Sequence, residues 1–162
     1  MRLVFDSNEF IFGLDEESGQ SASIELLNRF RGLIDETDDV ILIVPKIIRK
    51  ETHKNLPEEL RDEFYQYIFS TDRISVLWQD SVPEALYEKY RHVLKEEDAL
   101  IAAIAEAEQV DCIISDNRHF YERLQVDIFL TLTAEAFLHA LETGEIWQMI
   151  KKVRQNRTQK GP

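Results

Sequence analysis

Short polar clusters directly follow two apolar runs of the chain. Residues 3–5 are followed by Asp6, Ser7 and Asn8, and residues 112–114 by Ser115, Asp116 and Asn117. The apolar runs are too short for isolated helices and too continuous for half-exposed strands, so they predict buried strands of a parallel sheet. Because ligands of such sheets bind beyond the carboxyl ends of the strands, these polar clusters are candidate site residues.

Two further acids fall on predicted helices. Glu51 lies on a helix expected after a strand at residues 40–44, and Asp98 in the first turn of one expected from about 96 to 108. If both helices lean toward the same sheet edge, they join Asp6 and Asp116 in one carboxylate cluster. Clustered carboxylates repel one another unless a hard cation such as Mg²⁺ or Mn²⁺ neutralises them. Such an ion supports attack of water on a phosphodiester.

The same acids also have a simpler interpretation. Asp and Glu account for 31 of the 162 residues, so an acid at any chosen place is unsurprising. Asp6 and Asp116 would serve as helix N-caps, Asp98 would favour its helix dipole, and Glu51 would be a charge at the rim of an apolar face. Spacing alone therefore permits a shared metal site without requiring it.

The elements that must position these residues alternate along the chain. Residues 74–77 and 126–130 predict further strands, which gives a sheet of about five. Apolar periodicity predicts helices at 21–34 and 96–108, Pro45, Pro57 and Pro83 each open another, and Thr133 caps a last one. This alternation predicts an α/β fold, a three-layer α/β/α arrangement with a central, mostly parallel sheet.

Charge divides the chain into two parts. The net charge is −12, yet residues 151–162 hold five basic residues and no acid. We expect a domain over 1–150, too acidic to bind nucleic acid non-specifically. A flexible basic tail over 151–162 would either contact phosphates or be a solvated terminus. The single cysteine, the early Asp6 and the lack of any apolar run near the ~18 residues of a membrane span predict a cytoplasmic protein without membrane association.

Four segments, read in order, resemble the PIN domain family, including its VapC-like toxin ribonucleases. Residues 3–11 resemble the opening strand with its Asp-Thr-Asn-like triplet, and Val44-Pro45 followed by Glu51 resembles the second acidic position. Residues 98–103 are similar to the third, an aspartate leading an alanine-rich helix, and residues 113–120 to the fourth. Residues 133–138 resemble the end of the fold, so the resemblance spans nearly residues 1–141.

The resemblance implies a PIN-like fold and hydrolysis of RNA phosphodiesters with Mg²⁺ or Mn²⁺ as cofactor. Carried over by position, Asp6, Glu51, Asp98 and Asp116 would hold metal and act on the attacking water, supported by Asn8, Ser115 and Asn117. Many relatives are toxins of toxin–antitoxin pairs, which implies an RNA substrate and a small inhibitory protein partner. The sequence leaves open whether the protein forms a homodimer.

One position departs from the family's pattern. Aligned on Ser115 and Phe120, the fourth acid falls on Asn117, while the aspartate stands one place earlier at Asp116. Either Asp116 reaches the site from its offset position, or three acids and the Asn117 amide form it. The alternative to a nuclease is therefore a catalytically weak or inactive PIN-like module that binds RNA or a protein partner.

Overall fold

The computed structural model describes residues 1–15, 17, 19–37, 39–124 and 126–160. Its centre is a parallel sheet in the order β3-β2-β1-β4-β5. The strands are β1 (Arg2–Phe5), β2 (Ile41–Val44), β3 (Ile74–Val76), β4 (Cys112–Ile114) and β5 (Leu130–Leu132). The helices are α1 (Ser7–Leu14), α2 (Ser21–Glu36), α3 (Lys46–Asn55), α4 (Glu58–Ile68), α5 (Glu84–Arg91), α6 (Glu96–Ala107), α7 (Arg118–Arg123), α8 (Ala134–Glu142) and α9 (Glu145–Lys160).

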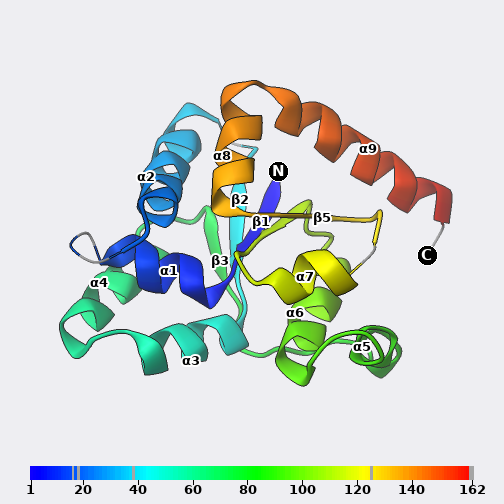
Figure 1. Ribbon diagram of the computed structural model, residues 1–162, viewed down its shortest axis with the longest axis horizontal. Coiled ribbons are helices and arrows are strands. Elements are labelled where there is room, and N and C mark those ends of the chain that lie inside the picture. The colour runs from blue at the N-terminus through cyan, green and yellow to red at the C-terminus, as the bar shows by residue number, and fades with distance from the viewer. Residues whose placement is uncertain (16, 18, 38, 125, 161–162) are drawn as a thin grey trace.

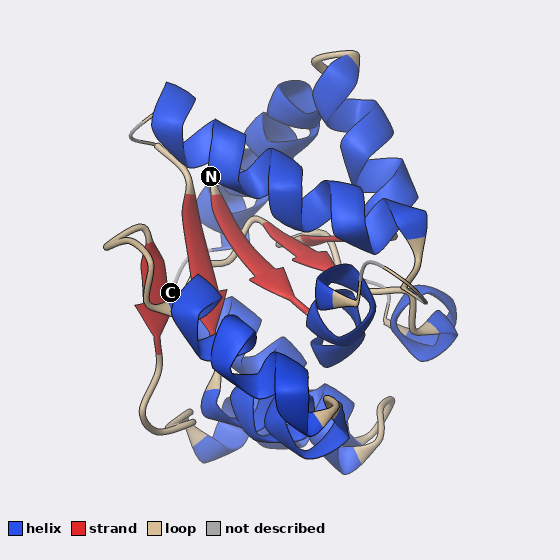
Figure 2. Ribbon diagram, turned by 90° about the vertical axis from the view of Figure 1, so that its left-hand side faces the viewer, coloured by secondary structure: helices blue, strands red, loops and turns tan. Residues whose placement is uncertain are grey.

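Helices cover both faces of this sheet, which confirms the predicted three-layer α/β/α fold (Figure 2). Helix α1 packs on α2, α3 and α4, and α8 packs between α2 and α9, while α5 and α6 form a separate pair (Figure 1). The central strands β1 and β4 are buried, as their continuous apolar runs predict. The parallel order places the ends of all five strands, and the loops that follow them, at one edge.

The helix boundaries follow the signals in the sequence closely. Pro45, Pro57 and Pro83 stand at the N-cap positions of α3, α4 and α5, where the missing proline N–H costs no intrahelical hydrogen bond. The hydroxyl of Thr133 accepts a hydrogen bond from the N–H of Ala136 and so caps α8 as predicted.

The last strand differs from its prediction over 126–130. Pairing begins only at Leu130, opposite Cys112, although Ile128 and Phe129 are also buried. The carbonyl oxygen of Ile128 accepts a hydrogen bond from Arg157 Nε at 2.6 Å, so it is used by α9 and not by a neighbouring strand. The apolar run therefore predicted the burial of Ile128 and Phe129 correctly, but it placed the start of the strand too early.

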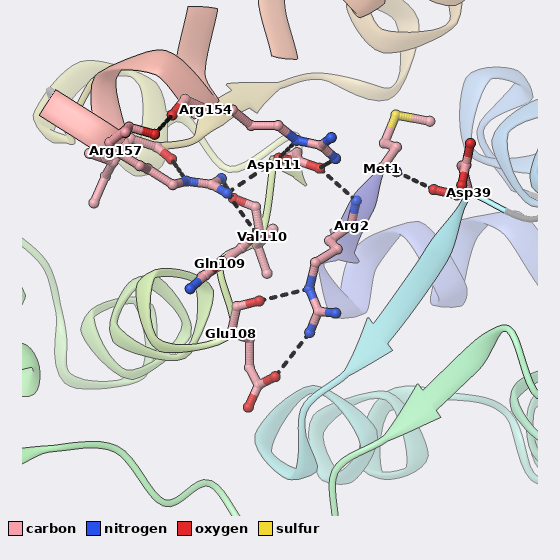
Figure 3. A network of polar contacts seen from close by, with 11 residues as sticks. Met1, Arg2, Asp39, Glu108, Gln109, Val110, Asp111, Arg154 and Arg157 are labelled. Carbon is pink, nitrogen blue, oxygen red and sulfur yellow. Dashed lines mark hydrogen bonds and ion pairs between the residues drawn. The ribbon is translucent and has the colours of Figure 1, made fainter. Parts of the chain in front are cut away.

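The basic C-terminal segment also differs from the expected flexible tail. Residues 151–160 of it form the second half of helix α9. Arg154 donates two hydrogen bonds to the fully buried Asp111, at 3.0 and 2.7 Å, and Arg157 lies 3.3 Å from the same carboxylate (Figure 3). Because Asp111 precedes β4, this contact lies at the sheet edge opposite the strand ends. Two of the five basic side chains are thus fixed far from the candidate site.

None of the helices in the described residues is both long and apolar enough to cross a lipid bilayer.

Candidate active site

Asp6 ends the central strand β1 and caps helix α1. Its Oδ1 accepts a hydrogen bond from the N–H of Ser7 at 2.8 Å, and its Oδ2 accepts one from Ser115 Oγ at 2.6 Å. Its own N–H donates to the carbonyl of Ile114 at 2.9 Å, which holds the ends of β1 and β4 together. Burial raises the pKa of Asp6, the hydrogen bonds from Ser115 and Ser7 oppose the rise, and the charge of Asp116 adds to it.

Ser115 and Asn117 connect Asp6 to the third predicted acid. Ser115 Oγ accepts a hydrogen bond from the N–H of Asn117 at 3.0 Å, and Asn117 Nδ2 donates to Asp98 Oδ1 at 3.3 Å. Asp98 lies in the first turn of α6, so this chain of contacts joins the ends of two strands to the start of a helix. Asp6, Ser115, Asn117 and Asp98 thus lie together at the carboxyl edge of the sheet.

Glu51 on α3 faces the same region. Burial raises its pKa, a hydrogen bond from the Ser7 side chain opposes this, and the charges of Asp6, Glu97 and Asp98 add to the rise. The pKa of Glu51 thus responds to Ser7, the residue after Asp6, and to the charges of Asp6 and Asp98. Hydrogen bonds through Ser115 and Asn117 link Asp6 to Asp98 of α6, and Glu51 lies on α3, which follows the carboxyl end of β2.

The other two predicted side chains are placed differently. Asp116 is exposed, although its negative charge contributes to the raised pKa of Asp6. Asn8 is half-buried in the first turn of α1, and within the described residues the hydrogen bonds to the carboxylate of Asp6 come from Ser7 and Ser115 instead. Of the two residues considered for the fourth position, Asn117 is the one in contact with Asp98.

Glu9 is a buried acid beside the site that sequence reasoning missed. It is 1% exposed, its Oε2 accepts a hydrogen bond from Ser23 Oγ at 2.8 Å, and its Oε1 has no hydrogen-bond partner. Burial raises its pKa to about 7, and the charges of Asp116 and Asp6 add to the rise. Its position three residues after Asp6, between Asn8 and two phenylalanines of an apolar helix, was the available signal.

A surface hollow of about 600 Å³ opens beside Glu51. Its walls come from α3, from the loop after β3 and from α6, and they include Lys46, Lys50, Lys54 and Glu97. A larger hollow of about 880 Å³ lies between α2 and α8 and is lined by none of the predicted site residues. Of the predicted site residues, Glu51 lines the hollow of about 600 Å³.

The donor chemistry of the site fits a hard divalent cation. All three acids offer carboxylate oxygens, and the pKa values of Asp6 and Glu51 are raised by burial and by negative neighbours, a cost that a cation would offset. In the part of the chain that the structure describes, no three His, Cys, Asp or Glu side chains form a group that could hold a metal ion. Ser115 and Asn117 connect Asp6 and Asp98 through hydrogen bonds.

Comparison with known proteins assigns the chain to a family. A model of the PIN domain matches residues 3–124, three quarters of the chain. The chain belongs to the PIN domain family. The predicted site residues of this PIN domain all lie inside the matched range, whereas α8 and α9 lie outside it. PIN domains are generally nucleases and typically use divalent metal ions.

A solved structure shares this PIN fold. It is a chain from the crystal structure of VapBC2 from Rickettsia felis bound to a DNA fragment from their promoter. The likeness has a TM-score of 0.55 at 14% sequence identity and covers 82% of this chain and 98% of the other. No curated protein matches the sequence. At this identity the structural likeness establishes the fold, and the chemistry must be argued from the side chains.

Proposed function

We propose that this PIN domain is a divalent-metal-dependent ribonuclease that hydrolyses RNA phosphodiester bonds. The observation that carries the proposal is the chain of hydrogen bonds that links Asp6 through Ser115 and Asn117 to Asp98 at the carboxyl edge of the sheet, together with the negative charges of both acids acting on Glu51 of α3. A protein that keeps such mutually repelling carboxylates together needs a reason to do so, and a cation-dependent reaction supplies one. Mg²⁺ and Mn²⁺ are the ions that an all-oxygen donor set favours.

Each side chain has a distinct task in this proposal. Asp6 and Asp98 supply carboxylate oxygens for the cation, and Ser115 fixes the orientation of Asp6 by donating to its Oδ2. A bound cation supplies stabilisation of the negative charge that develops on the phosphodiester. Glu51 accepts the proton of the attacking water, since a carboxylate with a raised pKa is a better base. Asp116 adds negative charge from the rim.

We also propose that the protein acts as the toxin of a toxin–antitoxin pair. The similar solved structure is of VapBC2, a toxin–antitoxin complex. In this proposal the partner limits access to the acids, and free RNA is the substrate.

Asn117 supports one alternative, a PIN-like module that binds RNA or protein without cleaving RNA. An amide stands where the family's pattern has a fourth acid, and it donates a hydrogen bond to Asp98. An amide contributes no negative charge to a cation site, so metal affinity would be lower than with four acids. Activity in the presence of excess Mn²⁺ separates the two functions.

The deciding experiment incubates the purified protein with labelled single-stranded RNA and Mn²⁺. We expect cleavage by the wild type and its loss in Asp6→Asn and Asp98→Asn, because each removes a charged ligand. Glu51→Gln should lower the rate by about a hundredfold or more, the usual contribution of a general base. Asp35→Asn, an exposed acid on α2, is the matched control and should cleave normally.

Thermal melting and RNA binding provide further tests of the proposal. Mn²⁺ should raise the melting temperature of the wild type and not of Asp6→Asn, since a ligand of the folded state stabilises that state. Cleavage that persists in both Asp6→Asn and Asp98→Asn would indicate a contaminating nuclease and refute the proposal. RNA binding without cleavage by the wild type would establish the alternative.

A further inference from the structure

Two exposed aromatic side chains stack against each other, one in the loop before β3 and one in the loop after it. Phe69, which follows α4, is 53% exposed and Trp78, which follows β3, is 66% exposed. Their ring centroids are 6.2 Å apart at an interplanar angle of 21°, and Tyr65 stacks on Phe69 at 6.5 Å and 12°. Single exposed apolar residues are common, but adjacent exposed rings form a continuous apolar patch, so this aromatic stack (Tyr65, Phe69 and Trp78) is a candidate binding surface.

A positive charge lies on the aromatic stack. The guanidinium carbon of Arg49 is 4.9 Å from the centroid of the Trp78 ring, and Arg49 Nε has no hydrogen-bond partner. No acid in the described part of the chain forms an ion pair with Arg49, so the ring and not a carboxylate orients the guanidinium. A cation over an indole can contact the phosphate next to a base that stacks on the same ring.

A lysine row connects the stack to the acids. Lys46, Lys50 and Lys54 are spaced four apart on α3, share one of its faces and line the hollow beside Glu51. Because successive helix residues are about 100° apart, this lysine row lies between Glu51 on one flank of α3 and Arg49 on the other. Within the ranges that the structure describes, these three lysines form no ion pair. Such a basic face stands out in a chain of net charge −12.

The loop that carries Trp78 is held at the carboxyl edge of the sheet. The N–H of Leu77 donates to the carbonyl of Val44 at 2.9 Å. The carboxylate of Asp80 accepts hydrogen bonds from the N–H groups of Lys46 and Ile47, both at 2.7 Å, and so caps α3. The loop that carries Trp78 is therefore attached to the start of α3, the helix that also carries the lysine row, Arg49 and Glu51.

We propose that the aromatic stack and the lysine row bind the single-stranded RNA substrate, with bases on Phe69 and Trp78 and phosphates along Lys46, Lys50 and Lys54. This inference rests on the proposed function, because it leads the strand toward Glu51. Rings that stack bases, beside cations that track the backbone, are the combination that proteins use for single strands. The same cations offset the repulsion between phosphates and an acidic protein. Duplex RNA, whose bases are already stacked, gains nothing from the rings.

The two tryptophans of the chain allow a direct measurement of contact. The Trp147→Phe variant leaves Trp78 as its one tryptophan, and the Trp78→Phe variant leaves Trp147, which is 45% exposed on α9. Titration with a 12-nucleotide single-stranded RNA in EDTA should quench the fluorescence of the first variant and leave the second nearly unchanged. The matching duplex should quench neither. Quenching of both tryptophans alike, or of neither, would overturn the proposal.

Affinity changes test the same surface independently. Trp78→Ala should weaken binding of the 12-mer by about tenfold, whereas Trp147→Ala should not. Replacing Lys50 and Lys54 by Gln should reduce the magnitude of the slope of log affinity against log salt by about 1.4. The same replacement at Lys151 and Lys152 should leave that slope unchanged. Normal RNA affinity in these variants would leave the stack as a surface for a protein and refute an RNA site.

The EDTA measurement separates this inference from the nuclease proposal. Binding in EDTA needs no hydrolysis, so quenching of Trp78 without any cleavage in Mn²⁺ would keep the RNA surface and reject the nuclease. Cleavage in Mn²⁺ by the wild type, with equal cleavage by Trp78→Ala at limiting RNA concentration, would keep the nuclease and reject the surface.

Discussion

The two oxygens of the Asp6 carboxylate serve two different parts of the fold. Oδ1 caps α1 through the N–H of Ser7, and Oδ2 receives the hydroxyl of Ser115. Asp6 therefore serves both as the N-cap of α1 and as a residue of the candidate site. The free energy of keeping this carboxylate buried is partly offset by its hydrogen bonds, but Glu9, three residues later, has a buried oxygen without a partner.

Glu9 should make stability depend on pH in a predictable direction. Its pKa is about 7 in the folded protein and 4.5 ordinarily, so the folded state binds more protons between these values. The contribution of Glu9 to the free energy of unfolding therefore falls as the pH rises from about 4.5 to 7, and it is constant above pH 7. The free energy of unfolding of Glu9→Gln should exceed that of the wild type by on the order of 3 kcal/mol at pH 8. At pH 4 the two should differ little, because Glu9 is then protonated in the folded protein.

Urea denaturation in EDTA at both pH values checks this. Glu25→Gln, which changes an exposed acid on α2, should follow the wild type. An equal stability difference between Glu9→Gln and the wild type at pH 4 and pH 8 would contradict a raised pKa at Glu9.

Helix α3 depends on a cap supplied from elsewhere in the chain. Its own N-cap, Pro45, has no side-chain donor or acceptor, and Asp80 accepts from the first two N–H groups in its place. The carboxylate also lies at the positive end of the helix dipole. Because α3 carries Glu51 and the lysine row, this one contact positions both the acid and the basic face.

Asp80→Ala should lower the free energy of unfolding by about 1–2 kcal/mol, the usual cost of losing an N-cap. The measurement is chemical denaturation, with Asp62→Ala on the exposed face of α4 as control. RNA affinity should fall as well, since the Trp78 loop loses its attachment to α3. Unchanged stability would show that water replaces the cap without cost.

The whole molecule separates its charges between the two edges of the sheet. At the strand ends, acids gather beside the lysine row, while at the opposite edge the buried Asp111 is neutralised by α9 (Figure 3). Burial would raise the pKa of Asp111, but hydrogen bonds from Arg154 and from the N–H of Arg2, with the charges of Arg154 and Arg157, hold it below its ordinary value. Arg157 also donates to the carbonyls of Ile128, Gln109 and Val110. The C-terminal helix is thus bound by specific polar contacts to the sheet.

Arg154→Leu should therefore destabilise the protein at neutral pH by about 2–3 kcal/mol, because it leaves a buried carboxylate with fewer partners. The loss should shrink as the pH falls and Asp111 becomes protonated in the variant, because a neutral carboxyl needs no cationic partner. Thermal or urea unfolding measures it, and Lys152→Leu on the exposed face of α9 is the control. If removal of Arg154 weakened RNA binding and left stability intact, α9 would be part of an RNA surface after all.

The strands, most helices and the position of Asp6 directly after a central strand could be predicted because their signals are local. A continuous apolar run marks a buried strand, a proline or threonine marks a helix start, and an acid directly after a strand falls at the binding edge of a parallel sheet. The start of β5 was missed because burial and strand pairing are separate properties. The charge of residues 151–162 likewise gave no indication of the partner that Arg154 and Arg157 would find at Asp111.

The layered α/β architecture and the order of the acids along the sheet edge follow from periodicity and from chain direction, so both can be deduced from the residues alone. The contacts of Asn117 with Asp98, of Asp80 with the start of α3, and of Trp78 with Phe69 became visible only in the folded protein. Each of these contacts joins residues from separate elements. Which side chains meet across such gaps depends on how the packed helices are placed, and no local pattern encodes that.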